Sequence, residues 1–255
     1  MRRREKFVIA AALLGLGLFL VQFISLEYRY WAILLFSFVS YLISAWALAE
    51  DLQKFEWITI LPFPTLYAGG VSLFYFLLPE NIVSRFFILG LFGVGMYALL
   101  LTSNIYSVAK GKAIQLLHAA HAVGLFFTLL TSLLFTNTIY SLHLPFYLNG
   151  LLVGLVHFPL AYMSLWSVNL EQRVEKREVV LASLLNLFLI ELAVIMSFFP
   201  ISDWNRALFI MAILYLGLGV LHNFLRGVLF SNTLREYSLV AAFVGAVFLL
   251  LLPLK

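Results

Sequence analysis

Several ionisable or strongly polar side chains lie inside stretches of this sequence that are otherwise apolar. They are four histidines, two asparagines, one glutamate and one arginine: His118, His121, His157, Asn186, Glu191, His222, Asn223 and Arg226. A charge at the centre of a transmembrane helix costs about 2.5–3.5 kcal/mol on insertion scales, so such residues need partners or a water-filled space. These eight residues are therefore the candidate functional residues of the chain.

Helical spacing predicts that some of these side chains face the same way. His118 and His121 are three residues apart, and His222 and Arg226 are four apart, so each pair shares one helix face. All except Glu191 fall in the same half of the predicted helices, and consecutive helices usually pack as neighbours. We therefore expect one polar cluster in which Glu191 compensates Arg226 or a protonated histidine, His157 or His222.

Three roles suit such a cluster. Chains of histidine and glutamate carry protons in pumps and transporters, because imidazole titrates near neutral pH. Histidines from separate helices can also bind iron or zinc, which makes His118, His121, His157 and His222 candidate metal or haem ligands. However, the segment His118-Ala-Ala-His121 lacks the spacing and the glutamate of an HExxH zinc site. The third role is structural, because polar side chains form hydrogen bonds between transmembrane helices.

The composition indicates that lipid surrounds most of the chain. Hydrophobic residues make up 64% of it and charged residues only 11%, against roughly 25% charged in soluble domains. The net charge of +4 does not indicate nucleic-acid binding, because no water-exposed domain with a basic face is predicted. The absence of cysteine excludes disulfides, thiolate metal sites and cysteine nucleophiles.

Apolar stretches of about 20 residues, the length that crosses a bilayer, recur along the whole chain. They predict an all-α polytopic helical bundle, a single transmembrane domain over residues 1–255 with no soluble domain. The nine expected spans are 7–26, 31–49, 57–78, 86–103, 114–135, 146–167, 179–199, 206–229 and 237–253.

The distribution of basic residues predicts the orientation, because cytoplasmic loops are enriched in lysine and arginine. With the N-terminus in the cytoplasm and the C-terminus outside, all but four of the 16 basic residues fall on the cytoplasmic side. The four exceptions are Arg29, Arg85, Arg206 and Lys255. Lys110, Lys112 and the segment 173–177 then form a basic cytoplasmic rim that would attract anionic headgroups.

Glycines and prolines mark close packing and irregular helices. Glycines in three spans predict close approach of helix backbones, namely Gly90, Gly93, Gly95, Gly150, Gly154, Gly217 and Gly219. Pro62, Pro64 and Pro159 predict bends or breaks, which mark binding sites in some transporters.

The acidic residues after the second span form a loop. Glu50 and Asp51 could bind Mg²⁺ together with a phosphate headgroup. Because Lys54 and Glu56 follow closely, we expect a solvated loop instead.

The segment from Gly95 to Tyr106, followed by Gln115-Leu-Leu-His118-Ala-Ala-His121, resembles uncharacterised multi-span membrane proteins from bacterial genomes. The resemblance covers the middle third of the chain. It implies a helical membrane fold and supplies no activity, substrate or catalytic residue.

We therefore expect a multi-pass protein of the inner, or cytoplasmic, membrane, with the lipid bilayer as its partner. The favoured function is movement of a solute or of protons through a cytoplasm-facing polar cavity between spans five to eight. The alternatives are a membrane-embedded enzyme or a metal- or haem-binding protein, and a structural or assembly subunit of a membrane complex. We lean against an enzyme and expect no cofactor.

Overall fold

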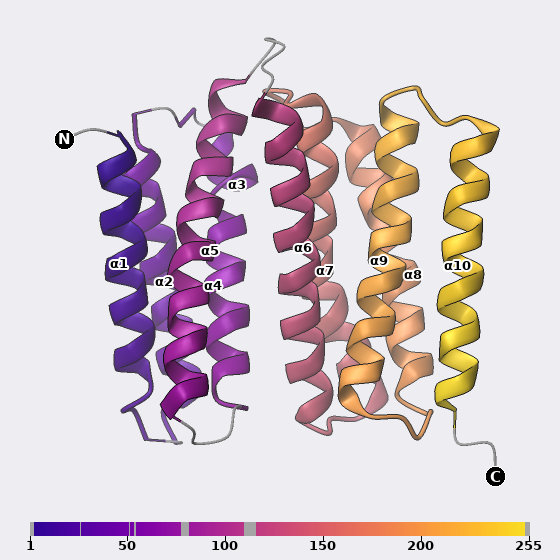
Figure 1. The fold of residues 1–255 in the computed structure, drawn as a ribbon, viewed down its shortest axis with the longest axis horizontal. Coiled ribbons are helices and arrows are strands. Elements are labelled where there is room, and N and C mark those ends of the chain that lie inside the picture. Colours follow the sequence, from indigo (N-terminus) through magenta and orange to yellow (C-terminus); the bar gives the residue numbers. More distant parts are fainter. Residues whose placement is uncertain are drawn as a thin grey trace. The chain divides into compact units, whose positions relative to one another are not determined.

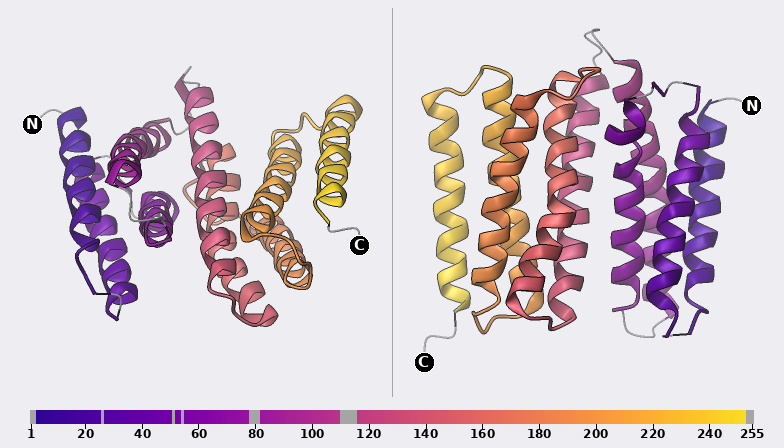
Figure 2. Two further views of the ribbon diagram at one scale, coloured as in Figure 1. Left: turned by 60° about the horizontal axis from the view of Figure 1, so that its bottom comes forward. Right: turned by 180° about the vertical axis from the view of Figure 1, so that it is seen from behind.

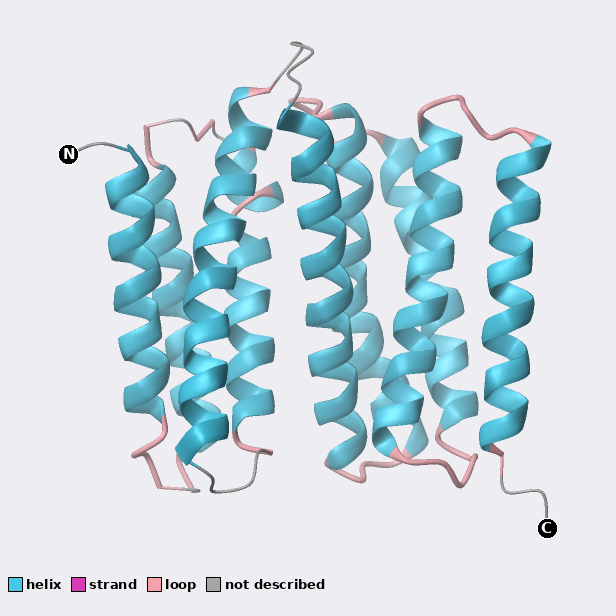
Figure 3. Ribbon diagram, in the orientation of Figure 1, coloured by secondary structure: helices cyan, strands magenta, loops and turns pink. Residues whose placement is uncertain are grey.

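The computed structural model describes residues 3–25, 27–50, 52–53, 55–77, 82–109 and 116–252, which form helices joined by loops and no strand (Figure 3). The all-α prediction is confirmed. The helices are α1 Arg3–Val21, α2 Arg29–Leu48, α3 Glu56–Thr59, α4 Pro62–Tyr75, α5 Ile82–Val108, α6 Leu116–Ser141, α7 Phe146–Asn169, α8 Lys176–Met196, α9 Asp203–Leu225 and α10 Ser231–Leu251.

Helices are the expected form because hydrocarbon offers the backbone no hydrogen-bonding partner, and a helix satisfies its own amides. Within the described residues, eight segments are long and apolar enough to cross a membrane, with α3 and α4 counted together as one. Helix α1 falls outside this set because charged residues fill its first turn. The polytopic bundle is thus confirmed, while the placement of either terminus inside or outside stays a prediction.

The third span is broken, as its prolines predict. Helix α3 ends at Thr59, and α4 begins at Pro62, a position where the missing proline N–H costs no helical hydrogen bond. The amides of Ile60 and Leu61 both point back to the carbonyl oxygen of Glu56, at 2.8 and 3.4 Å. Pro159, in contrast, lies inside the continuous helix α7.

The helices group into two compact units, Met1–Phe127 and Thr128–Lys255, so that α6 begins in the first and continues in the second (Figure 1). The units are described separately below. The expectation of a single transmembrane domain stays a prediction.

In the first unit, α1 packs against α2 and α5, and α2 packs against α4 (Figure 2). An aromatic cluster lies at its centre: Tyr67 stacks on Phe92 with ring centroids 5.6 Å apart and meets Phe127 edge-on at 5.1 Å. A Cβ added at Gly95 would overlap the Tyr67 side chain and come within 2.9 Å of Phe127. Gly95 therefore makes room for two aromatic side chains, whereas the prediction was a close approach of helix backbones.

In the second unit, the tightest contact joins α7 to α8. A Cβ at Gly150 would lie 2.7 Å from Val194, and one at Gly154 would lie 2.5 Å from Ile190. Helix α10 packs mainly against α9 and has no buried residue along its length (Figure 1). The prediction of close packing is confirmed for Gly150 and Gly154.

Gly217 and Gly219 also lie against side chains, those of Leu185 and Tyr237. At Gly90 and Gly93 the prediction is wrong, because an added Cβ would meet nothing within 4 Å. Both line a shallow apolar groove between α1 and α5 instead.

The acidic loop after α2 is only partly solvated. Glu50 is exposed and accepts a hydrogen bond from Lys6 Nζ, while Arg3 Nε lies 3.6 Å from its other carboxylate oxygen. Glu56, expected to be solvated, is only 1% exposed, which corrects that expectation. Six charged residues used in the sequence predictions lie outside the described residues: Arg2, Asp51, Lys54, Lys110, Lys112 and Lys255.

We predict that Gly154→Leu destabilises the protein, because its side chain would occupy space already filled by Ile190 on α8. Overpacking of this kind costs about 1–3 kcal/mol. The thermal unfolding midpoint in detergent should fall by several degrees. Gly93→Leu is the matched control, since the same side chain enters open space there, and equal midpoints for the two variants would contradict the packing described.

The Lys6–Glu50 contact predicts a pH dependence. The hydrogen bond and charge of Lys6 hold the pKa of Glu50 below its ordinary value of 4.5. A lowered pKa in the folded state means that the contact stabilises the fold above about pH 4.5 and is lost as the pH falls through the folded-state pKa. In Glu50→Gln, the decline in unfolding temperature between pH 6 and about pH 3.5 should be shallower than in the parent chain. Glu27→Gln, at an exposed loop position, should behave like the parent.

Candidate polar site in the second unit

His157 is the only histidine that is fully buried among those the structure describes. It lies midway along α7, with Nδ1 2.8 Å from the carbonyl oxygen of Val153 and Nε2 2.7 Å from Ser132 Oγ on α6. Because a carbonyl oxygen only accepts, Nδ1 carries a proton and donates it to Val153, and Nε2 shares a hydrogen bond with the Ser132 hydroxyl. The imidazole therefore ties α6 to α7 in the middle of the span.

Ser132 belongs to a row of hydroxyl side chains on α6. Thr128, Ser132, Thr136 and Tyr140 follow one another at intervals of four residues, which places them on one helix face. All four are buried. Since Ser132 contacts α7 and the Tyr140 hydroxyl donates to the carbonyl of Ala193 on α8 at 2.9 Å, this face of α6 points into the second unit.

Several polar atoms along these helices are buried and make no hydrogen bond to the protein. They include Thr136 Oγ1 and Asn137 Oδ1 on α6, Asn149 Oδ1 on α7 and Asn186 Oδ1 on α8, together with Thr131 Oγ1, the Tyr162 hydroxyl and Glu178 Oε2 on the same helices. Asn186 lies beside Gly154, one turn from His157, because a Cβ on that glycine would be 3.6 Å from its amide nitrogen. Leaving such a group unsatisfied costs about 1–3 kcal/mol, so each needs water or a ligand.

His222, in the last turn of α9, adds a polar group at the end of the unit where α8 begins. Its Nε2 lies 3.1 Å from both the hydroxyl and the carbonyl oxygen of Ser164, which is two turns from His157 on α7. Asn223 donates to the carbonyl of Gly219 at 2.8 Å and lies 3.5 Å from the Tyr237 hydroxyl on α10. Ser164, the partner of His222, is seven residues from His157 on α7 and therefore lies on the same helical face, while His157 and His222 share no hydrogen-bonding partner in the described part of the chain.

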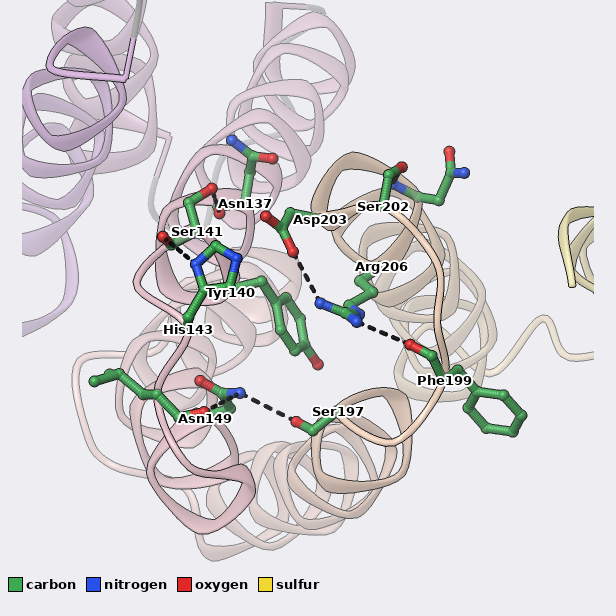
Figure 4. Close-up of polar contacts among 12 residues, drawn as sticks. Asn137, Tyr140, Ser141, His143, Asn149, Ser197, Phe199, Ser202, Asp203 and Arg206 are labelled. Atoms are coloured by element: carbon green, nitrogen blue, oxygen red, sulfur yellow. Dashed lines mark hydrogen bonds and ion pairs between the residues drawn. The ribbon is translucent and has the colours of Figure 1, made fainter. Parts of the chain in front are cut away.

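At the opposite end, a charged network joins four helices (Figure 4). Arg206 on α9 donates to Asp203 and to the carbonyl of Phe199, each at 2.8 Å, and lies over the Tyr140 ring at 5.3 Å. Asn149 on α7 donates to Ser197, the residue that caps the end of α8, at 3.1 Å. Figure 4 shows these side chains arranged around the end of the bundle, with Asn137 beside them.

Together these groups form a set of polar residues distributed along the length of α6 and α7, which we call the polar seam. It runs from Ser164 and His222, past His157 and Ser132, to the Arg206 network. It comprises Thr128, Ser132, Thr136, Asn137, Tyr140, Asn149, His157, Ser164, Asn186, Ser197, Asp203, Arg206 and His222.

The residues predicted from sequence divide between the two units. His118 and His121 lie in the first, where His118 is exposed and His121 packs against Tyr106 with ring centroids 5.7 Å apart. The other six lie in the second. Of these, His157, Asn186 and His222 are in the polar seam and Asn223 is beside it.

Glu191 and Arg226 do not join the seam. Both side chains are exposed, and Glu191 makes no ion pair with any residue that the structure describes. Arg226 caps the end of α9, whereas Glu191 lies about four turns from the matching end of α8. The expected compensation of Arg226 by Glu191 is therefore not formed.

The histidines are not arranged as metal ligands. Within the described part of the chain, no three side chains of histidine, aspartate or glutamate gather closely enough to hold a metal ion. Both ring nitrogens of His157 already bond to protein groups.

Two buried carboxylates were missed from sequence. Glu56 accepts from the Gln53 amide at 2.9 Å and from Ser107 Oγ at 2.8 Å, and Glu178 accepts from Asn169 at 3.2 Å. Each lies in the first turn of its helix, where an anion interacts favourably with the helix dipole. Both carboxylates lie near the end of a predicted span, where a charged side chain is expected to be exposed to water.

Comparisons with known proteins give a family and no activity. A family model described as a protein of unknown function, DUF5656, matches residues 50–251. No curated protein and no solved structure matches the chain. Because the family model covers most of the sequence, the chain belongs to the DUF5656 family.

Proposed function

We propose that this chain is a transport-type protein of the inner membrane that moves protons, or a small polar solute, along the polar seam. The seam lies among α6, α7, α8 and α9, which are the spans five to eight of the sequence prediction. The resemblance to bacterial membrane proteins supports a bacterial cytoplasmic membrane as its location.

The length of the seam supports a path across the membrane. On α7, Asn149, His157 and Ser164 are spaced by about two turns each, or ~11 Å at 1.5 Å per residue. This spacing places polar groups near both ends and at the centre of one span. By the distribution of basic residues, the Ser164–His222 end is the cytoplasmic one.

The observation that carries the proposal is the set of buried polar atoms without protein partners: Thr136 Oγ1, Asn137 Oδ1, Asn149 Oδ1 and Asn186 Oδ1. Polar residues that only hold helices together would bond to one another across the interface. These groups instead leave hydrogen-bonding capacity available to water or to a passing solute. His157 lies among them, and an imidazole can both donate and accept a proton.

Flux measurements test the proposal directly. The purified chain would be reconstituted into liposomes containing a pH-sensitive dye, with a valinomycin-clamped potassium gradient driving proton entry. Light-scattering measurements with urea and glycerol gradients would detect small polar solutes. We expect at least one flux above that of protein-free liposomes; no flux of either kind would overturn the proposal in favour of a structural subunit.

We predict that His157→Asn reduces the flux at least tenfold. Asparagine preserves a polar side chain at this buried position but cannot take up and release a proton. His118→Asn is the matched control, because the same change is made at an exposed position on α6 in the other unit. Equal flux in the two variants would remove His157 from the path.

Thr136→Val separates transport from a packing role. Valine has the shape of threonine without the hydroxyl, and the Thr136 hydroxyl bonds to no protein group. We expect a lower flux together with an unchanged or higher thermal unfolding midpoint. Thr138→Val is the control, because Thr138 Oγ1 donates to the Leu134 carbonyl at 2.8 Å and lies outside the seam. A lower midpoint with unchanged flux in Thr136→Val would assign the hydroxyl to packing.

A further inference from the structure

An apolar groove of about 500 Å³ lies between α8, α9 and α10, away from the polar seam. Its walls are leucines and other apolar residues, including Leu184, Phe188 and Val220, with Gly217 at its floor. Tyr237 and Ser238 supply its polar atoms, and the Ser238 hydroxyl already bonds to its own helix at Leu234. The groove therefore suits a hydrocarbon chain.

The length of the groove indicates the kind of occupant. Its lining begins about one turn from the shared end of the three helices, at Leu181, Leu221 and Leu234, and reaches Phe188, Ile213 and Ala241. Eight residues of helix span ~12 Å, close to the ~15 Å of hydrocarbon in one leaflet. A partner helix would need about 30 Å, so the depth matches one acyl chain.

Positive charge surrounds the mouth of the groove. Each of its three helices carries an arginine at this end: Arg177 on α8, Arg226 at the end of α9 and Arg235 on α10. The Arg177 guanidinium lies 4.7 Å from the ring of Phe224, between α8 and α9. Arg226 is exposed at the end of α9.

At this end, the three helices that form the groove carry fewer acidic than basic residues. Glu236 on α10 is exposed, and Glu171 and Glu175 lie in the loop before α8. Glu178 is buried and bonded to Asn169. With Lys176 counted, the three groove helices carry four basic residues at this end against Glu178 and Glu236, and this positive balance complements a phosphate headgroup.

We propose that this groove is a binding site for an anionic phospholipid. One acyl chain lies between α8, α9 and α10, and the headgroup phosphate contacts the arginines at the mouth. The lipid belongs to the leaflet that holds the starts of α8 and α10, which the distribution of basic residues identifies as cytoplasmic.

Native mass spectrometry of the detergent-purified full chain tests this site. The protein is mixed with equal amounts of phosphatidylglycerol and phosphatidylcholine of the same chain length, and the retained adducts are counted. We expect preferential retention of phosphatidylglycerol, and about a fivefold loss of that preference for each of Arg177→Gln and Arg235→Gln. Arg85→Gln, in the other unit, should leave the preference unchanged.

A matched pair of variants tests the groove itself. Ala241→Phe fills it from the exposed helix α10, whereas Ala242→Phe places the same ring outside the lining. Only the first should lose the bound phosphatidylglycerol. Equal retention of the two lipids, or equal lipid binding by the two variants, would overturn the proposal. A change in oligomeric mass in Ala241→Phe with lipid retention unchanged would also overturn it, in favour of a second copy of the chain as occupant.

Discussion

The close approach of α7 and α8 at Gly150 and Gly154 positions most of the polar seam. Without Cβ atoms at these two positions, Val194 and Ile190 of α8 reach the backbone of α7. The neighbouring polar residues then come together: Asn149 reaches Ser197, and Asn186 lies beside Gly154 within one turn of His157. Because hydrophobic association is weak between helices already in lipid, small residues of this kind are what allow such contacts.

The chemistry of the bilayer explains why the fold was predictable. Hydropathy identified the spans because a chain inside hydrocarbon must form all its backbone hydrogen bonds internally, as a helix does. The prolines located the break between α3 and α4. Helix ends were less accurate where polar residues continue a helix past its most apolar stretch: α5 extends to Val108 and α6 to Ser141, both past their predicted ends.

The site was predictable only in part. The histidines and Asn186 were predicted as candidate functional residues because such side chains are rare in lipid. Of these, His157, His222 and Asn186 lie in the seam. The row of hydroxyls on α6 was missed because serine and threonine are common in transmembrane helices, although the spacing of Thr128, Ser132 and Thr136 was visible in the sequence. The Arg206 network was missed because Arg206 belongs to a span end, where an arginine is expected to meet water.

Helix α9 borders the polar seam on one side and the proposed lipid site on the other. Arg206 and His222 contact α6 and α7, whereas Ile213, Gly217 and Leu221 line the apolar groove. A second apolar groove of about 240 Å³ separates α9 from α10 nearer the other end. Side chains that line such a groove make fewer van der Waals contacts across it. Helix α10 also has no buried residue. Acyl chains in these grooves would supply contacts there, so the proposed lipid would help to hold α10 against α9. An anionic headgroup anchored at Arg177 and Arg235 would in turn fix that lipid beside the helix that carries His222.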